Sequence, residues 1–170
     1  MPTIRPAHLR DIPAITDIYN EAGVGTTASY ALEPVSVADR QKWFERLTAT
    51  GYPVLVMEDP DGLIIGYASY GQFRPLEGYR HTVEHSVYIR SGHRTAGAGR
   101  MLMTALIDYA QGRGVHVMLG VVDGSNEDSI AFHRRLGFEV AGRLPQVGRK
   151  FGRWLDVVFM TMIFESNEPS

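Results

Sequence analysis

Apolar residues recur along this chain at two different spacings, and each spacing predicts one kind of element. Between residues 12 and 19 they stand three or four positions apart, which predicts a helix with a buried stripe. The members of that stripe are Ile12, Ile15, Ile18 and Tyr19. Asp11 and Pro13 favour a helix start at this point, Asp11 as the cap. A second helix is expected to begin at the cap residue Ser36 and to end at Gly51. Its inward residues are predicted to be Val37, Trp43, Phe44 and Leu47.

Short runs of apolar and β-branched residues predict the strands. They are expected at about 3–5, 53–57, 63–70, 80–90, 115–122, 139–146 and 154–164. A turn is predicted at 59–62, and loops at 23–34, 72–78 and 147–153. Two more helices are predicted at 99–111 and 126–136, the second one stopped by Gly137. Because strands stand in runs with helices interspersed, this order predicts an α/β or α+β domain with a mixed sheet.

The composition limits the classes of protein to consider. A chain of 170 residues, 44% of them apolar, suits one domain with a sizeable core. We expect that domain to cover residues 1–165 and residues 166–170 to form a flexible tail. The net charge of −2 does not favour nucleic-acid binding. The absence of cysteine excludes disulfides, thiolate zinc sites and cysteine nucleophiles. Since we find neither a signal-peptide core nor a membrane-length apolar run, we expect a cytoplasmic protein without membrane contact.

A glycine-rich segment at 94–100 carries the clearest chemistry. It contains Gly97 and Gly99 and lies between a strand-like run and a helix-like run. Glycines let the backbone approach a ligand, and a helix start presents unpaired N–H groups, so the segment predicts a phosphate cradle. The neighbouring arginines Arg90, Arg94 and Arg100 add charge.

Two better-known phosphate loops do not match this segment. The chain holds no Gly-Lys pair, which a P-loop requires, and Leu102 stands where a dinucleotide fingerprint has its third glycine. A glycine-rich helix start without any ligand stays open as an alternative.

The strand expected at 80–90 carries a carboxylate, Glu84, at its centre. Strand alternation places Thr82, Glu84, Ser86 and Tyr88 on one face, and Val83, His85, Val87 and Ile89 on the other. A carboxylate in such a strand is disfavoured without a reason, and a catalytic site is one reason. A salt bridge to an arginine, or binding of a substrate ammonium group, is the alternative.

Three groups of residues together resemble a known family. They are the strand residues Arg80 to Tyr88, the loop and helix residues from Arg94 to Phe138, and the C-terminal residues Val147 to Asp156. The second group includes Asn126, Ser129, Ile130, His133 and Leu136-Gly137-Phe138. From about Ile4 to Phe164 the chain resembles the GNAT superfamily of N-acetyltransferases, and within it the phosphinothricin and methionine sulfoximine (methionine sulfone) acetyltransferases. The resemblance implies a mixed, mostly antiparallel sheet of about seven strands flanked by four helices.

The same resemblance implies an activity and a set of site residues. Acetyl would pass directly from acetyl-CoA to the amino group of methionine sulfoximine, methionine sulfone or phosphinothricin, without a metal. Glu84 would act as the base and His133 as the acid. The donor would bind at Val87, Tyr88, Ile89, Arg94, Thr95, Ala96, Gly97, Ala98, Gly99, Arg100 and Asn126. The acceptor would bind at Arg74, Pro75, Leu76, Glu77, Glu84, His85 and Ser86.

Other readings of these residues stay open. His133 could be a helix-surface or capping histidine, His85 a core histidine, and Arg74 a solvated loop residue. The acceptor could be a polyamine, a drug or a protein N-terminus, or the chain could be an acyl-CoA sensor without turnover. The resemblance also implies a homodimer.

Overall fold

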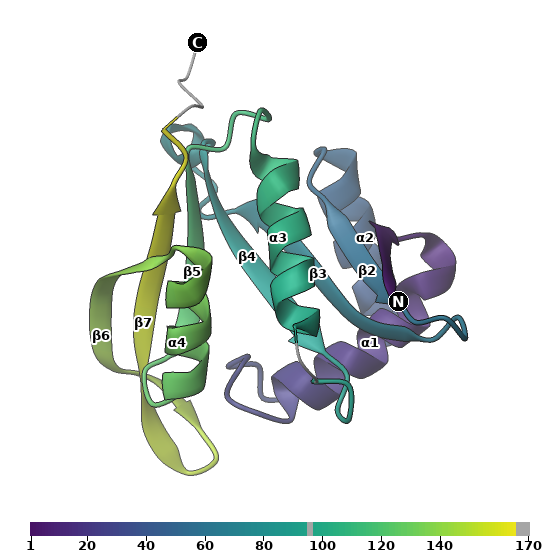
Figure 1. The fold of residues 1–170 in the computed structure, drawn as a ribbon. Coiled ribbons are helices and arrows are strands. Elements are labelled where there is room, and N and C mark those ends of the chain that lie inside the picture. Colours follow the sequence, from purple (N-terminus) through teal and green to yellow (C-terminus); the bar gives the residue numbers. More distant parts are fainter. Residues whose placement is uncertain (95–96, 166–170) are drawn as a thin grey trace. The chain divides into compact units, whose positions relative to one another are not determined.

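The chain folds as a mixed sheet of seven strands flanked by four helices in a computed structural model that describes residues 1–94 and 97–165 (Figure 1). The strands are β1 (Thr3–Pro6), β2 (Val54–Glu58), β3 (Ile64–Gln72), β4 (Thr82–Ile89), β5 (Val117–Asp123), β6 (Glu139–Lys150) and β7 (Arg153–Ile163). The helices are α1 (Ile12–Ile18), α2 (Val37–Ala49), α3 (Ala98–Ala110) and α4 (Glu127–Leu136).

The strand order confirms the predicted mixed sheet. Hydrogen-bonded neighbours follow the order β1-β2-β3-β4-β5-β7-β6. Strands β4 and β5 pair in parallel, whereas β1–β2, β2–β3, β5–β7 and β6–β7 are antiparallel pairs. The chain is divided into two compact units, one of residues 1–70 and 86–106, the other of residues 71–85 and the chain from 107 onward. Strand β4 and helix α3 contribute residues to both units.

The first unit holds the predicted helix stripe in its core. Ile12, Ile15 and Ile18 are buried there, together with Phe44, Val54, Val56, Ile64 and Tyr67. Tyr19 packs against this cluster, and the chain continues from it as a π-helical turn over Tyr19–Val24. The predicted loop therefore begins two residues later than the sequence indicated.

The two predicted helix caps of the first unit have different outcomes. Ser36 does cap α2, because its hydroxyl accepts a hydrogen bond from the Asp39 N–H at 3.1 Å. Asp11 precedes α1, but its carboxylate does not cap that helix. It accepts hydrogen bonds from the His8 N–H at 2.7 Å and from Arg5 Nη1 at 2.8 Å instead. The prediction for Asp11 is wrong because an arginine competes for its carboxylate. Val37, predicted to face inward, lies in the first turn of α2 and is 44% exposed.

The second unit contains the long hairpin of β6 and β7 and the helix α4 (Figure 1). The predicted loop at 147–153 is wrong, because β6 continues to Lys150 and only Phe151 and Gly152 form the turn. Both turn residues have positive φ, 52° and 74°, as a tight two-residue hairpin requires. Gly137 ends α4 with φ 105°, which confirms its predicted role.

Within residues 1–94 and 97–165, no helix has the length and apolar character that crossing a membrane would require.

Candidate functional site

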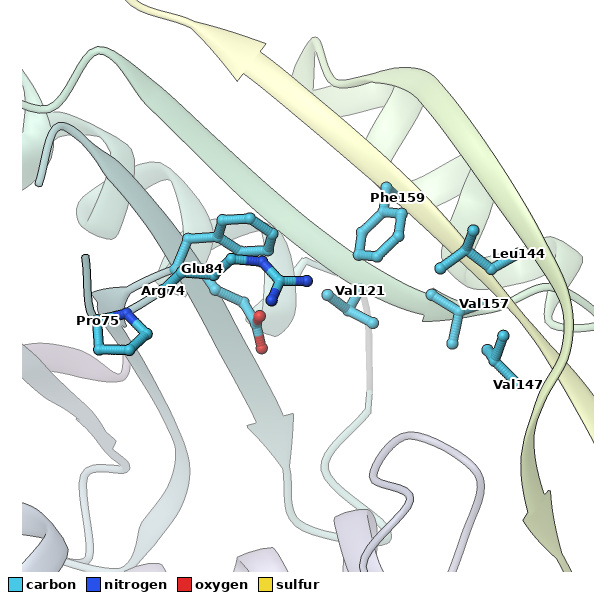
Figure 2. Close-up of a pocket in the computed structure, with 9 residues that line it drawn as sticks. Arg74, Pro75, Glu84, Val121, Leu144, Val147, Val157 and Phe159 are labelled. Carbon is cyan, nitrogen blue, oxygen red and sulfur yellow. The ribbon is translucent and has the colours of Figure 1, made fainter. Parts of the chain in front are cut away.

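A pocket of about 450 Å³ opens beside Glu84 in the second unit (Figure 2). Its lining comes from β4, β5, β6, β7 and the loop after β3, and consists of Phe73, Arg74, Pro75, Glu84, Val121, Leu144, Val147, Val157 and Phe159. Figure 2 shows the Glu84 carboxylate and the Arg74 guanidinium directed into this space. The pocket thus presents one carboxylate, from Glu84, and one guanidinium, from Arg74, against otherwise apolar walls.

Strand pairing explains why these walls share a face with Glu84. Glu84 pairs with Leu119 on β5, and Val121 lies two residues further along that strand, on the same face. Val121 in turn pairs with Phe159 on β7, and Val157 again lies two residues away. The sequence analysis did not place these apolar residues in the site, because strand pairing decides which of their faces is shared with Glu84. Alternation within each strand was a usable signal for which residues share a face.

The environment of the Glu84 carboxylate shifts its pKa. Its side chain is open to solvent on the pocket side, but the apolar lining displaces part of its hydration shell. This desolvation raises the pKa of Glu84 above its ordinary value. A raised pKa brings a carboxylate closer to the working range of a general base.

His85 lies on the opposite face of β4, as strand alternation predicted, and is only 7% exposed. Its ring stacks on that of His133 from α4, with centroids 5.1 Å apart, and both rings contact Phe138 edge-on. Gly120 of β5 lies directly beneath the pair, since a Cβ there would be 2.8 Å from His85 Nε2. The structure therefore brings His85 to His133 and places Glu84 on the other face of the strand.

The hydrogen bonds of this pair fix both tautomers. His133 Nδ1 lies 2.7 Å from the Ser129 carbonyl oxygen, so it must carry a proton and donate it. In the neutral ring His133 Nε2 is then an acceptor, and it accepts a hydrogen bond from the N–H of His85 Nε2 at 3.1 Å. His85 Nδ1 is left as an acceptor with no partner among the described residues. Burial lowers the pKa of both histidines, so both are neutral near pH 7.

Asn126 caps α4 in the same unit. Its Oδ1 accepts a hydrogen bond from the Ser129 N–H at 3.0 Å. This contact satisfies one N–H at the start of the helix, and the amide nitrogen is the group with which Asn126 could donate to a ligand.

The loop after β3 holds the predicted acceptor residues 74–77. Gln72 Nε2 donates to the carbonyl oxygens of Arg74 and Leu76 at 2.6 and 3.1 Å. Arg74 and Pro75 line the pocket, whereas Leu76 is 70% exposed and Glu77 begins a short 3₁₀ turn. Sequence reasoning missed Gln72, the last residue of β3, because a single polar side chain at a strand end carries no distinctive signal.

The first unit contains Ser86 and the predicted donor residues Val87, Tyr88, Ile89, Arg94, Gly97, Ala98, Gly99 and Arg100. Gly97 has φ 94°, a conformation that favours glycine, and its carbonyl accepts the first helical hydrogen bond of α3 from the Met101 N–H at 2.8 Å. Arg94 and Arg100 are exposed, Ala98 and Gly99 open the helix, and Thr95 and Ala96 lie outside the described residues. The N-terminus of α3 is therefore open to an anion at Gly97.

Tyr88 belongs to an aromatic cluster of the first unit. Its ring lies 5.5 Å from those of Tyr19 and Tyr67. The guanidinium of Arg40 stacks on Tyr19 and Trp43 at 4.1 and 3.9 Å and donates to the Tyr67 hydroxyl at 2.7 Å. The Tyr88 side chain therefore packs within this cluster, and a ligand of the strand at this position would bind the Tyr88 backbone groups.

Among residues 1–94 and 97–165, no group of three or more histidine, aspartate or glutamate side chains is arranged to hold a metal ion.

Comparison with known proteins gives a consistent family. A family model described as an acetyltransferase (GNAT) domain matches residues 4–159. The L-methionine sulfoximine/L-methionine sulfone acetyltransferase of Pseudomonas aeruginosa is 51% identical over 94% of this chain and 93% of its own. The phosphinothricin N-acetyltransferase of Alcaligenes faecalis is 38% identical over 93% of this chain and 80% of its own. A Salmonella typhimurium acetyltransferase, solved with its cofactor acetyl-CoA, superposes with a TM-score of 0.95 at 45% identity, covering 100% of this chain and 98% of that one.

Proposed function

Because this chain belongs to the GNAT acetyltransferase family, and is thus an N-acetyltransferase that uses acetyl-CoA, we propose that its acceptor is a small α-amino acid. The proposed acceptors are methionine sulfoximine, methionine sulfone and phosphinothricin, in line with the names of the relatives. The observation that carries this proposal is the pocket itself, in which Glu84 and Arg74 face one apolar cavity.

The chemistry of an α-amino acid complements this pocket. Its carboxylate would bind the Arg74 guanidinium, which can donate two parallel hydrogen bonds. Its ammonium group would lie toward Glu84, and its side chain would lie against the apolar residues Val121 and Phe159. A volume of about 450 Å³ is within the range of small-molecule sites.

Glu84 is proposed as the base. It would take a proton from the acceptor ammonium, directly or through a water molecule. The freed amine would attack the thioester carbonyl carbon of acetyl-CoA. The nitrogen would then release a second proton to water as the carbon–sulfur bond breaks, which gives the N-acetyl product and the CoA thiolate. The raised pKa of Glu84 supports this role. A glutamate with its ordinary pKa of about 4.3 is a weak base for an ammonium group.

The donor is proposed to bind through residues 94–100, with backbone N–H groups at the start of α3 facing the pyrophosphate. The backbone of residues 87–89 would align the pantetheine as an added strand, and the Asn126 amide would donate to it. His133 is the proposed acid for the thiolate. In that role its Nε2 must first take up a proton from water, and the hydrogen bond from His85 would have to break.

A homodimer in the cytoplasm completes the proposal. Several large apolar side chains of the β6–β7 hairpin are exposed, among them Phe151 at 62% and Trp154 at 59%. Contiguous exposed apolar patches mark protein–protein association sites. Light scattering of the purified protein measures the oligomeric state.

The test of this function is CoA release from acetyl-CoA with a panel of amines. We expect turnover with the sulfoximine, the sulfone and phosphinothricin, and none with polyamines or peptide N-termini. Turnover confined to the latter amines would overturn the acceptor assignment. Binding of acetyl-CoA without release in the presence of any amine would identify a sensor instead of an enzyme.

A further inference from the structure

Strand β6 carries a wide irregularity where it borders the pocket. Leu144 pairs with Val157 and Gly148 pairs with Leu155, so three residues of β6 (145–147) lie opposite the single residue Asp156 of β7. Pro145 cannot donate a ladder hydrogen bond, and Gln146 has a positive φ of 59°. This conformation is unfavourable for a glutamine and persists only where its surroundings hold it.

The Asp156 side chain holds this bulge from the facing strand. Its Oδ1 accepts a hydrogen bond from the Gln146 N–H at 2.8 Å, and its Oδ2 accepts one from Arg143 Nε at 3.0 Å. Arg143 Nη2 also lies 2.9 Å from Oδ2. These contacts lower the pKa of Asp156, first through the Gln146 N–H and then through Arg143, so the carboxylate is charged when it binds the bulge.

Gly124 provides the room that this arrangement needs. A Cβ at Gly124 would lie 2.9 Å from Arg143 Nη2 and 3.0 Å from Asp156 Cβ. The Gly124 N–H also donates to the Asp156 carbonyl oxygen at 3.0 Å, which ties the end of β5 to the same point of β7.

The bulge decides which side chains of β6 enter the pocket. Leu144 and Val147 both line the cavity (Figure 2). In a regular strand, residues three positions apart point to opposite faces. Both can therefore face the cavity only because the bulge changes the alternation between them.

We propose that Asp156 is a positioning residue for acceptor specificity, because it holds the bulge that directs Val147 into the acceptor pocket. This proposal rests on the proposed function, in which this pocket binds the acceptor. Asp156 does not line the cavity and takes no part in bond making. Its loss should weaken acceptor binding and leave the donor site unaffected.

The experiment compares steady-state constants of Asp156→Ala, Asp156→Asn and Val147→Ala with those of the wild type, using methionine sulfone and acetyl-CoA. We expect Asp156→Ala to raise the KM for the sulfone about tenfold with little change in the KM for acetyl-CoA. Val147→Ala should show the same selective loss. Asp156→Asn keeps an oxygen for the Gln146 N–H and should show a smaller effect, which provides a folded variant if the alanine protein is unstable.

A second substitution separates positioning from general stability. Glycine adopts positive φ without strain, so adding Gln146→Gly to Asp156→Ala should restore part of the acceptor KM. If the wild type is active, two outcomes would overturn this proposal but not the proposed function. One is an unchanged acceptor KM in Asp156→Ala, and the other is an equal rise of both KM values that Gln146→Gly does not reverse. A wild type that acetylates none of the proposed acceptors would overturn the proposed function, and this inference with it.

Discussion

His85 Nε2 donates a hydrogen bond to His133 Nε2 across 3.1 Å, and both rings are buried in the second unit. Because His133 Nδ1 already donates to Ser129, His133 Nε2 can accept this hydrogen bond only while the His133 ring is neutral. Protonating His133 at Nε2 would remove the shared acceptor, whereas protonating His85 at Nδ1 would leave the hydrogen bond in place; either step would put a charge in an apolar environment. This relationship makes the pair sensitive to pH.

The first prediction concerns stability in acid. Unfolded histidines bind protons below about pH 6.5, whereas the folded pair resists them because burial lowers the pKa of both residues. The unfolded state then binds more protons, so the free energy of unfolding should fall as the pH drops below about 6.5. Each histidine contributes up to about 1.4 kcal/mol per pH unit, and His85→Phe should remove about half of the slope.

Denaturant unfolding between about pH 5 and 7 measures this slope. The raised pKa of Glu84 has the opposite sign, since the folded state then binds more protons than the unfolded state above the ordinary glutamate pKa. The measurement should therefore be made in a Glu84→Gln background. An unchanged slope in His85→Phe would show that the pair does not titrate as we describe.

The second prediction concerns the glycine beneath the pair. A Cβ at Gly120 would lie 2.8 Å from His85 Nε2 and 3.1 Å from His133 Nε2, and packed rings cannot withdraw easily. Gly120→Ala should therefore lower the free energy of unfolding by about 1–3 kcal/mol. Gly142→Ala is the matched control, because nothing lies within 4 Å of a Cβ at Gly142. Equal stability of the two variants would contradict the packing described here.

Local patterns were sufficient for most of the helices and strands and for the two faces of β4. Alternation alone separated Glu84 from His85, and the structure confirms this by burying His85 and leaving Glu84 on the pocket side. The Ser36 cap and the Gly137 stop were also predictable, because each depends on atoms only a few residues away.

The features that escaped prediction depend on partners distant in the sequence. His85 and His133 are 48 residues apart, and nothing local to either one indicates the contact. The bulge at Gln146 depends on Asp156, ten residues further on, and β6 continues beyond it to Lys150, whereas the sequence predicted the strand to end at Gln146 and a loop over 147–153. Arg5 draws the Asp11 carboxylate away from α1 in the same manner.

The third prediction concerns the proposed base. Glu84→Gln keeps the size of the side chain and removes the proton acceptor, so kcat should fall by about 10²–10⁴-fold. The acidic limb of the pH profile should lie above the ordinary glutamate range in the wild type, since the pKa of Glu84 is raised, and should disappear in the variant. Glu84→Asp should retain part of the activity. A higher acceptor KM with nearly unchanged kcat would identify Glu84 as an ammonium ligand and not a base.

The fourth prediction concerns recognition of the acceptor carboxylate. Arg74→Ala should raise the KM for methionine sulfone about 10–100-fold, since a charged hydrogen-bond partner is removed. An amine of the same shape without the carboxylate should react equally poorly with both proteins. Arg80→Ala is the control, because Arg80 is exposed nearby and does not line the pocket. Equal losses for both acceptors would assign Arg74 a role other than carboxylate binding.

The last prediction concerns the donor loop. Gly97 has φ 94°, where an alanine is strained by about 1–2 kcal/mol, so Gly97→Ala should turn the N–H groups at the start of α3 away from their present direction. We expect the KM for acetyl-CoA to rise about tenfold while the acceptor KM is nearly unchanged. Gly51→Ala provides the control, because Gly51 has φ 84° with open space around it and ends a different helix. It should lose similar stability without any change in acetyl-CoA affinity. If both variants bind acetyl-CoA as well as the wild type, by calorimetry and by KM, the pyrophosphate does not depend on this loop.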